Sequence, residues 1–77
     1  MQKTTITVNT VEFKIAEKTA AGTVTRKVYL GRELVAKIVE RDNGFDLHYI
    51  ENGRNIGGDV CKSLDECFDT LSNYCGF

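Results

Sequence analysis

The stretch that decides the fold is residues 34–57, which read LVAKIVERDNGFDLHYIENGRNIG. Two Asn-Gly pairs divide it, at residues 43–44 and 52–53. This dipeptide is the strongest short signal for a two-residue hairpin turn, because that turn needs positive φ at both central residues. Apolar and polar residues alternate around both pairs, as they do in half-buried strands. The pattern therefore predicts three antiparallel strands, over residues 34–41, 45–51 and 54–57.

Turns at the two Asn-Gly pairs also predict which residues lie opposite one another. The first turn places Ile38 opposite Tyr49, and the second places Tyr49 opposite Ile56. Apolar residues then meet on one face of all three strands, which is the arrangement that fixes a register. Gly57-Gly58 is predicted to release the chain from the sheet toward the next element.

Residues 24–30, VTRKVYL, alternate in the same way and predict another strand upstream. A short loop at residues 31–33 would join it to the strand that follows. That loop places Leu30 beside Leu34 and Val28 beside Ala36.

Residues 10–21 allow two interpretations. Val11, Phe13 and Ile15 alternate like a strand, whereas Ile6 and Val8 alternate with the opposite parity. A bulge or turn at residues 9–10 would join the two segments. Residues 9–12 also fit the start of a helix, and the alanines at 16, 20 and 21 favour one. The sequence leaves both open.

The C-terminal segment predicts a helix over residues 64–74. Residues 63–66, SLDE, fit a capping box, in which a serine and a glutamate satisfy free amides at the helix start. Two acidic residues lie in the first turn, where the helix dipole favours anions, and Gly76 is a suitable stop. An apolar stripe recurs at helical spacing, formed by Leu64, Cys67, Phe68, Leu71, Tyr74 and Cys75.

These elements predict an α+β fold in one domain spanning residues 1–77: an antiparallel β-meander of four to five strands with one C-terminal α-helix packed on one face. The helix can cover only one face of the sheet. The residues expected to face it are Val11, Phe13, Ile15, Val28, Leu30, Leu34, Ala36, Ile38, Leu47, Tyr49 and Ile56.

Length and composition exclude several classes of protein. Seventy-seven residues are too few for a dinucleotide-binding fold or a barrel enzyme. No apolar run is long enough for a secretory signal or a membrane span. The three cysteines, Cys61, Cys67 and Cys75, are an odd number crowded into the end of the chain, unlike a secreted disulfide framework. We expect a cytoplasmic protein with reduced thiols and no membrane partner.

Charge is divided unevenly along the chain. Residues 1–41 hold eight Lys or Arg and four Glu, a net of +4, whereas residues 42–77 hold two basic and seven acidic side chains, a net of −5. Such a division affects association more than folding.

The sheet face away from the predicted helix is the first candidate binding surface. An apolar centre with a basic rim is typical of such surfaces, and a plain solvated sheet face is the alternative. Its candidate partner-binding residues are Lys27, Tyr29, Val35, Lys37, Val39, Arg41, His48 and Ile50. A second candidate is an acidic face, formed by Asp59, Asp65, Glu66 and Asp69, although charged helix faces are usually only solvated.

We assign no catalytic, metal or cofactor residues from the sequence. The single histidine, His48, belongs to the uncovered face, whereas Cys67 and Cys75 belong to the helix stripe. A nucleophile and its base must lie within hydrogen-bond reach of each other, so only Cys61 is left as a candidate partner. The cysteine spacing does not match a zinc site, and no phosphate-binding glycine motif is present.

The run VYLGRELVAKI at residues 28–38, the Asn-Gly hairpins and the closing Gly57-Gly58 and SLDEC segments resemble small phage-encoded accessory proteins. Some of these, such as anti-CRISPR proteins, inhibit bacterial defence complexes. The resemblance implies a non-enzymatic inhibitor that occupies a surface of a host complex, and it assigns no site residues.

The first hypothesis is therefore a protein-binding module of this inhibitor type, whose partner is another protein or a host nucleoprotein complex. A second is a small nucleic-acid-binding or regulatory protein that uses the basic N-terminal half. Only one aromatic residue on the uncovered face and the acidic C-terminal half weigh against it. A third is a structural or assembly protein that buries the uncovered face in a homodimer.

Overall fold

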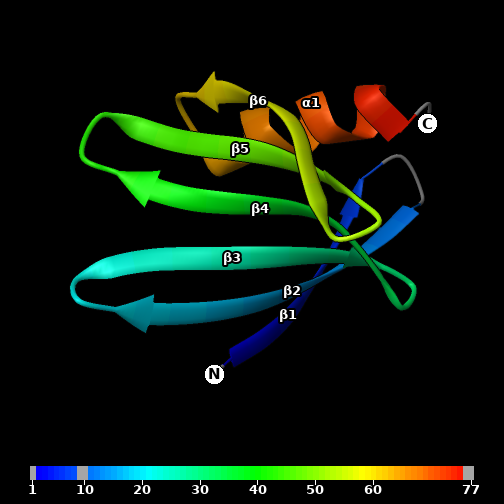
Figure 1. Ribbon diagram of the computed structural model, residues 1–77, viewed down its shortest axis with the longest axis horizontal. Coiled ribbons are helices and arrows are strands. Elements are labelled where there is room, and N and C mark those ends of the chain that lie inside the picture. The colour runs from blue at the N-terminus through cyan, green and yellow to red at the C-terminus, as the bar shows by residue number, and fades with distance from the viewer. Residues whose placement is uncertain (1, 9–10, 76–77) are drawn as a thin grey trace.

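The computed structural model describes residues 2–8 and 11–75, with the side chains of 5–7 and 11–75. Its strands are β1 (Gln2–Val8), β2 (Val11–Ala20), β3 (Thr23–Leu30), β4 (Glu33–Arg41), β5 (Gly44–Glu51) and β6 (Arg54–Cys61), and its helix is α1 (Leu64–Cys75) (Figure 1). The strands form one antiparallel sheet in sequence order. The α+β class and the C-terminal helix are thus confirmed, but the sheet has six strands rather than four to five.

Four of the strands match those predicted, the fifth comes from the segment that the sequence left open, and the sixth is β1 at residues 2–8. Residues 11–20 form β2, which pairs with β1 over its N-terminal part and with β3 over its C-terminal part, so the helical interpretation is wrong. Pairing on both sides stabilises extended backbone more than alanine propensity favours helix, since tertiary context overrides propensity. The turn expected at residues 9–10 and the stop at Gly76 lie outside the described residues.

The β4–β5 turn lies one residue earlier in the chain than predicted, which shifts the pairing of the two strands by two residues. Arg41 pairs with Gly44, so the turn consists of Asp42 and Asn43, and Tyr49 lies opposite Ala36 instead of Ile38. The shift of two residues leaves every side chain on its expected face, because side chains alternate with a period of two.

Tertiary packing explains why Gly44 belongs to a strand rather than a turn. Its φ is +146°, and a Cβ at this position would lie 2.5 Å from the carbonyl oxygen of Cys61. The glycine therefore serves the close approach of β6 to β5.

The β5–β6 turn lies at Asn52-Gly53 as predicted, and both residues have positive φ. The register then shifts, so that Tyr49 lies opposite Gly57 and Ile50 opposite Asn55. Ile56 becomes the extra residue of a bulge and is 47% exposed, so its predicted place in the core is wrong. β6 also continues through Gly57-Gly58 to residue 61, instead of ending there.

A second bulge lies where β3 pairs with β4. Val28 pairs with Ala36 as predicted, but Tyr29 pairs with Leu34 and Leu30 with Glu33, which leaves Val35 as the extra residue. The bulge exchanges two neighbours: Leu34 now lies opposite an outer-face tyrosine, whereas Val35 packs against the core. The predicted inward position of Leu34 and outward position of Val35 are therefore wrong.

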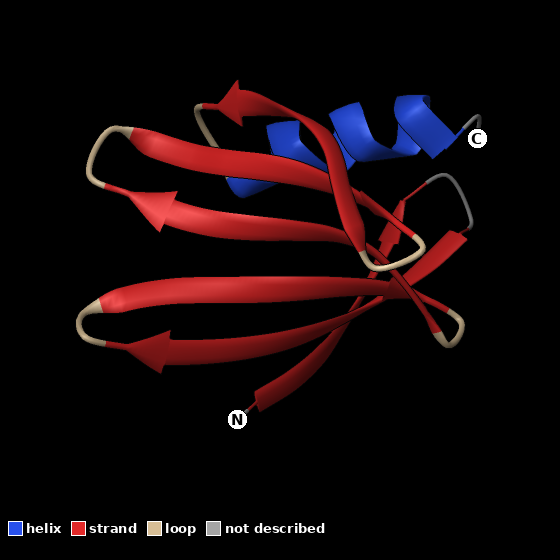
Figure 2. Cartoon of the chain, in the orientation of Figure 1, coloured by secondary structure: helices blue, strands red, loops and turns tan. Residues whose placement is uncertain are grey.

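The core lies between α1 and the sheet face that α1 covers, which we call the inner face (Figure 2). Cys67, Phe68 and Leu71 of the helix are buried there, and the rings of Phe13 and Phe68 are 6.1 Å apart. The helix contacts β1, β5 and β6, so it lies against both edge strands of the coiled sheet. The buried core residues from the sheet are Phe13, Ile15, Val28, Ala36, Ile38, Leu47, Tyr49 and Cys61.

The predicted cap holds the start of this helix. The amide of Glu66 donates to the Ser63 hydroxyl at 3.1 Å, and the Glu66 carboxylate accepts from the amide of Lys62 at 3.0 Å. Within the described residues, no helix has the length and apolar character needed to cross a membrane.

Candidate binding surface

The sheet face opposite α1 carries the candidate surface, and we call it the outer face. The cross-strand register identifies its side chains, because residues paired across strands point to the same side. They include Thr5, Lys14, Ala16, Lys18, Thr25, Lys27, Tyr29, Leu34, Lys37, Val39, Asp46, His48, Gly58 and Val60.

Three of the predicted contact residues form one row across the sheet. Lys27 of β3 pairs with Lys37 of β4, which pairs with His48 of β5. Directly opposed side chains have Cβ atoms about 4.5–5.5 Å apart, and like charges there are destabilising. Neither lysine forms an ion pair with any described residue. The row thus keeps two uncompensated positive charges side by side.

Two other predicted residues flank this row. Tyr29 is half-buried between Lys14 and Leu34, and Val39 is half-buried between Thr25 and Asp46. The outer face therefore has an apolar side chain on each side of its basic row.

The remaining predicted residues have other roles. The Arg41 guanidinium contacts Asp46 at 2.7 Å, so its charge is compensated within the sheet. Ile50 lies in the bulged hairpin opposite Asn55, at the margin of the row. Val35 does not belong to the surface, because the bulge between β3 and β4 lets it pack against the core.

His48 takes part in a local hydrogen-bond arrangement. Its Nδ1 lies 3.1 Å from the Asn55 side-chain nitrogen, and the Asn55 side-chain oxygen accepts from the amide of Gly57. An amide nitrogen can only donate, so this contact needs Nδ1 as the acceptor. Cys61, the one candidate nucleophile left by the sequence, is buried on the inner face, so it does not lie beside His48.

A groove of about 580 Å³ lies on the outer face where β1, β2 and β3 adjoin. Four cationic residues line it: Lys14, Lys18, Lys27 and Arg32. The other lining residues are Thr5, Ile15, Ala16, Thr25, Tyr29 and Gly31, and no carboxylate side chain is among them. None of the four cations forms an ion pair with a described residue.

Sequence reasoning missed three of these cations. Lys14 and Lys18 lie in the segment that it left open between strand and helix, and Arg32 lies in a turn, where parity assigns no face. The signal was present in the strand interpretation, because Lys14, Ala16 and Lys18 alternate with the buried Phe13 and Ile15.

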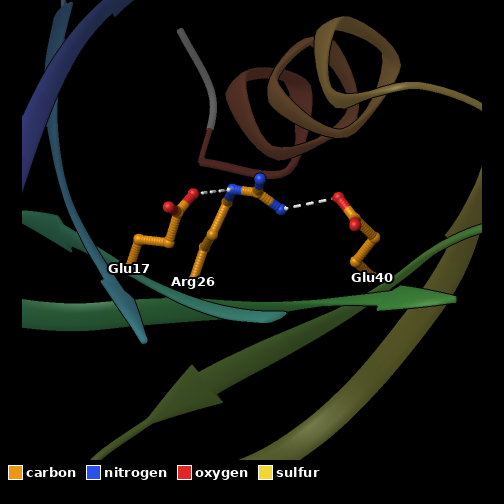
Figure 3. A network of polar contacts seen from close by, with 3 residues as sticks. All are labelled: Glu17, Arg26 and Glu40. Carbon is orange, nitrogen blue, oxygen red and sulfur yellow. Dashed lines mark hydrogen bonds and ion pairs between the residues drawn. The ribbon is translucent and has the colours of Figure 1, made fainter. Parts of the chain in front are cut away.

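One arginine of the basic half serves the inner face instead. Arg26 of β3 contacts Glu17 at 2.9 Å and Glu40 at 3.3 Å, between β2 and β4 (Figure 3). Its guanidinium carbon also lies 6.0 Å from the centre of the Phe45 ring. This charge is therefore not available to a partner.

The predicted acidic face divides in a similar way. Asp59 accepts a hydrogen bond from the Tyr49 hydroxyl at 2.6 Å, and Glu66 caps the helix, so both have structural roles. Burial, and next this hydrogen bond to a carboxylate, raise the pKa of Tyr49 well above its ordinary value. Asp65 and Asp69 are exposed, and nothing in the structure brings the four carboxylates to one ligand site.

The thiols lie on the side of the sheet that α1 covers. Burial raises the pKa of Cys67, and a hydrogen bond with Cys61 raises it further. Burial also raises the pKa of Cys75, with a smaller effect of Glu33. Protonated thiols are poor nucleophiles and poor metal ligands. In the described part of the chain, no three His, Cys, Asp or Glu side chains converge as a metal site.

No protein-family model matches the chain, and no curated protein or solved structure is significantly similar to it.

Proposed function

We propose that the protein is a non-enzymatic binding module that attaches by its outer face to an acidic surface of another protein. The observation that supports this is a set of uncompensated cations: Lys14, Lys18, Lys27 and Lys37 on the uncovered sheet face, and Arg32 in the adjoining turn. Positive charge that is not used within the fold raises the rate and specificity of docking on a negative partner. Tyr29 and Val39 supply the apolar contacts beside it.

Covering a partner's surface is the mechanism that this arrangement favours. The module would act by occlusion in the host cytoplasm, in the manner of the phage-encoded inhibitors of defence complexes that the sequence resembles. Its action then depends on affinity and on the position of the covered surface, and it needs no reactive group.

A capture experiment tests this function with a matched charge control. Tagged wild-type protein and the variant Lys27→Gln/Lys37→Gln are incubated with nuclease-treated bacterial lysate, and bound proteins are identified by mass spectrometry. The control is Arg54→Gln/Lys62→Gln, which also removes two positive charges, but at positions outside the basic surface. We expect a stoichiometric protein partner that the control retains and the outer-face variant loses.

Tyr29→Ala provides an independent test without a change of charge. Truncating a central aromatic contact typically costs about 2 kcal/mol or more of binding, or about a thirtyfold loss of affinity. If the partner is still captured by both the Lys27→Gln/Lys37→Gln variant and the Tyr29→Ala variant, the assignment to the outer face is refuted. Capture that nuclease abolishes would favour the nucleic-acid alternative, and a concentration-dependent dimer without any partner would favour the assembly alternative.

A further inference from the structure

Resting on this proposed function, we propose that the groove over β1–β3 binds an extended acidic segment of the partner protein, with Ala16 as its floor and Lys14, Lys18 and Lys27 as its rim.

Ala16 makes the groove possible because it is a small residue at an outer-face position. It pairs with Lys27 and is only 8% exposed, although it lies on the face opposite the helix and outside the core cluster. Its methyl group therefore lies below the long side chains around it. Along β2, Lys14 and Lys18 flank it at two residues on either side.

The spacing of the rim fits an extended peptide. A strand rises about 3.3 Å per residue, so Lys14 and Lys18 are separated by roughly 13 Å along β2. An extended peptide has the same rise, so two acidic residues four positions apart would match these lysines. The residue midway between them would then lie over Ala16, where a small side chain fits.

Charge on the groove favours carboxylates as ligands. Arg32 adds a fourth cation, Thr5 and Thr25 add hydroxyl groups, and no Asp or Glu among the described residues lines the groove. With no acidic partner within the described residues, the cations are available to an external anion.

Two observations favour a protein segment over a nucleic acid. Among the described lining residues Tyr29 is the one aromatic side chain, whereas single-strand sites stack successive bases on several aromatics. The chain also carries a formal net charge of −1, which opposes a long polyanion beyond the groove itself.

The test uses short peptides and nuclear magnetic resonance titration of the full chain. The probes are a peptide with Glu at every fourth position and Ser at the positions between, the same peptide with Gln for Glu, and an oligothymidine of similar length. We expect the Glu peptide to bind and to shift the amide signals of Ala16, Lys27 and Tyr29, and the Gln peptide to bind at least tenfold more weakly.

Two kinds of variant locate the site. Ala16→Leu fills the groove without changing charge and should weaken the Glu peptide at least tenfold. Lys14→Gln/Lys18→Gln keeps the floor intact and should weaken binding of the Glu peptide about two- to thirtyfold, since each of the two exposed ion pairs contributes about 0.2–1 kcal/mol. Arg54→Gln/Lys62→Gln should stay within about twofold of the wild type. Thermal unfolding of each variant establishes that it is folded.

Several outcomes would overturn the inference: tighter binding of the oligothymidine with the same variant pattern, no binding of the Glu peptide, or full binding by folded Ala16→Leu and Lys14→Gln/Lys18→Gln proteins. The proposed function is tested separately by the capture experiment. It stands if capture of the partner still needs Lys27, Lys37 and Tyr29, and it is refuted if capture does not need them.

Discussion

Arg26 offers the sharpest test of how the fold uses charge, because it is a cation on the inner face with two carboxylate partners. Its side chain is 15% exposed, whereas Glu17 and Glu40 are 35% and 43% exposed. Water therefore screens both ion pairs, and each contributes roughly 0.5 kcal/mol, or about 1 kcal/mol together. The aliphatic stem adds a separate contribution, because it is buried with the head group against the sheet.

Two substitutions separate these contributions. Arg26→Met removes the charge and retains most of the stem, so we expect a loss of about 1 kcal/mol. Arg26→Ala also removes two methylene groups at about 0.8 kcal/mol each, so the total loss should be roughly 2.5 kcal/mol. Urea unfolding followed by far-UV circular dichroism measures both, since the expected losses exceed the error of the midpoint comparison.

Salt provides the control for this reasoning. At 1 M salt the Debye length falls to about 3 Å, so the loss caused by Arg26→Met should shrink. The further loss in Arg26→Ala should persist, because it comes from packing. Equal losses in the two variants, or a loss in Arg26→Met that does not respond to salt, would refute the division into ion pairs and stem packing.

Three further predictions concern other parts of the fold. Gly58→Ala should destabilise by about 1–3 kcal/mol in urea unfolding, because its Cβ would lie 2.6 Å from the Leu47 carbonyl oxygen, while Val60→Ala, at a side chain 78% exposed, should change stability by less than about 0.5 kcal/mol. Because the folded state raises the pKa of Cys67 above its ordinary 9.0, stability should be complete below that pH and decline as pH rises toward about 12, and urea midpoints that stay constant over this range would contradict the burial argument. Ser63→Ala should cost about 1 kcal/mol by loss of the helix cap, and Ser63→Asp should restore most of it in the same assay.

The sequence predicts the faces of this sheet better than its register. Alternation places Val28, Ala36 and Ile38 on the inner face, and all three are fully buried. The two-residue shift of the β4–β5 hairpin does not change this, because parity survives any even shift. The bounds and the cap of the helix are equally well predicted, since they depend on local features, although Tyr74 of the predicted stripe is 52% exposed.

What the sequence does not predict depends on contacts between distant strands. The bulges at Val35 and Ile56 have no local signal in the sequence, because each arises where the pairing register between two strands shifts by one residue. Gly44 and Gly58 imitate turn signals, but each is required by the backbone of a neighbouring strand. The groove depends on β2 being a strand, which only its pairing with β1 and β3 decides.

The cations of this protein have two different roles, one in the fold and one in the proposed function. Arg26 and Arg41 form ion pairs within the sheet, whereas the outer-face lysines have no acidic partner in the described part of the chain. A guanidinium donates from several nitrogens in a fixed plane, which suits it to permanent contacts, and a lysine ammonium is a mobile point charge. Lys27 opposite Lys37 is a cost to the free protein, since like charges repel across a strand pair. An acidic partner would relieve that repulsion on binding. The two lysines would therefore lower the stability of the free protein and raise its affinity for the partner.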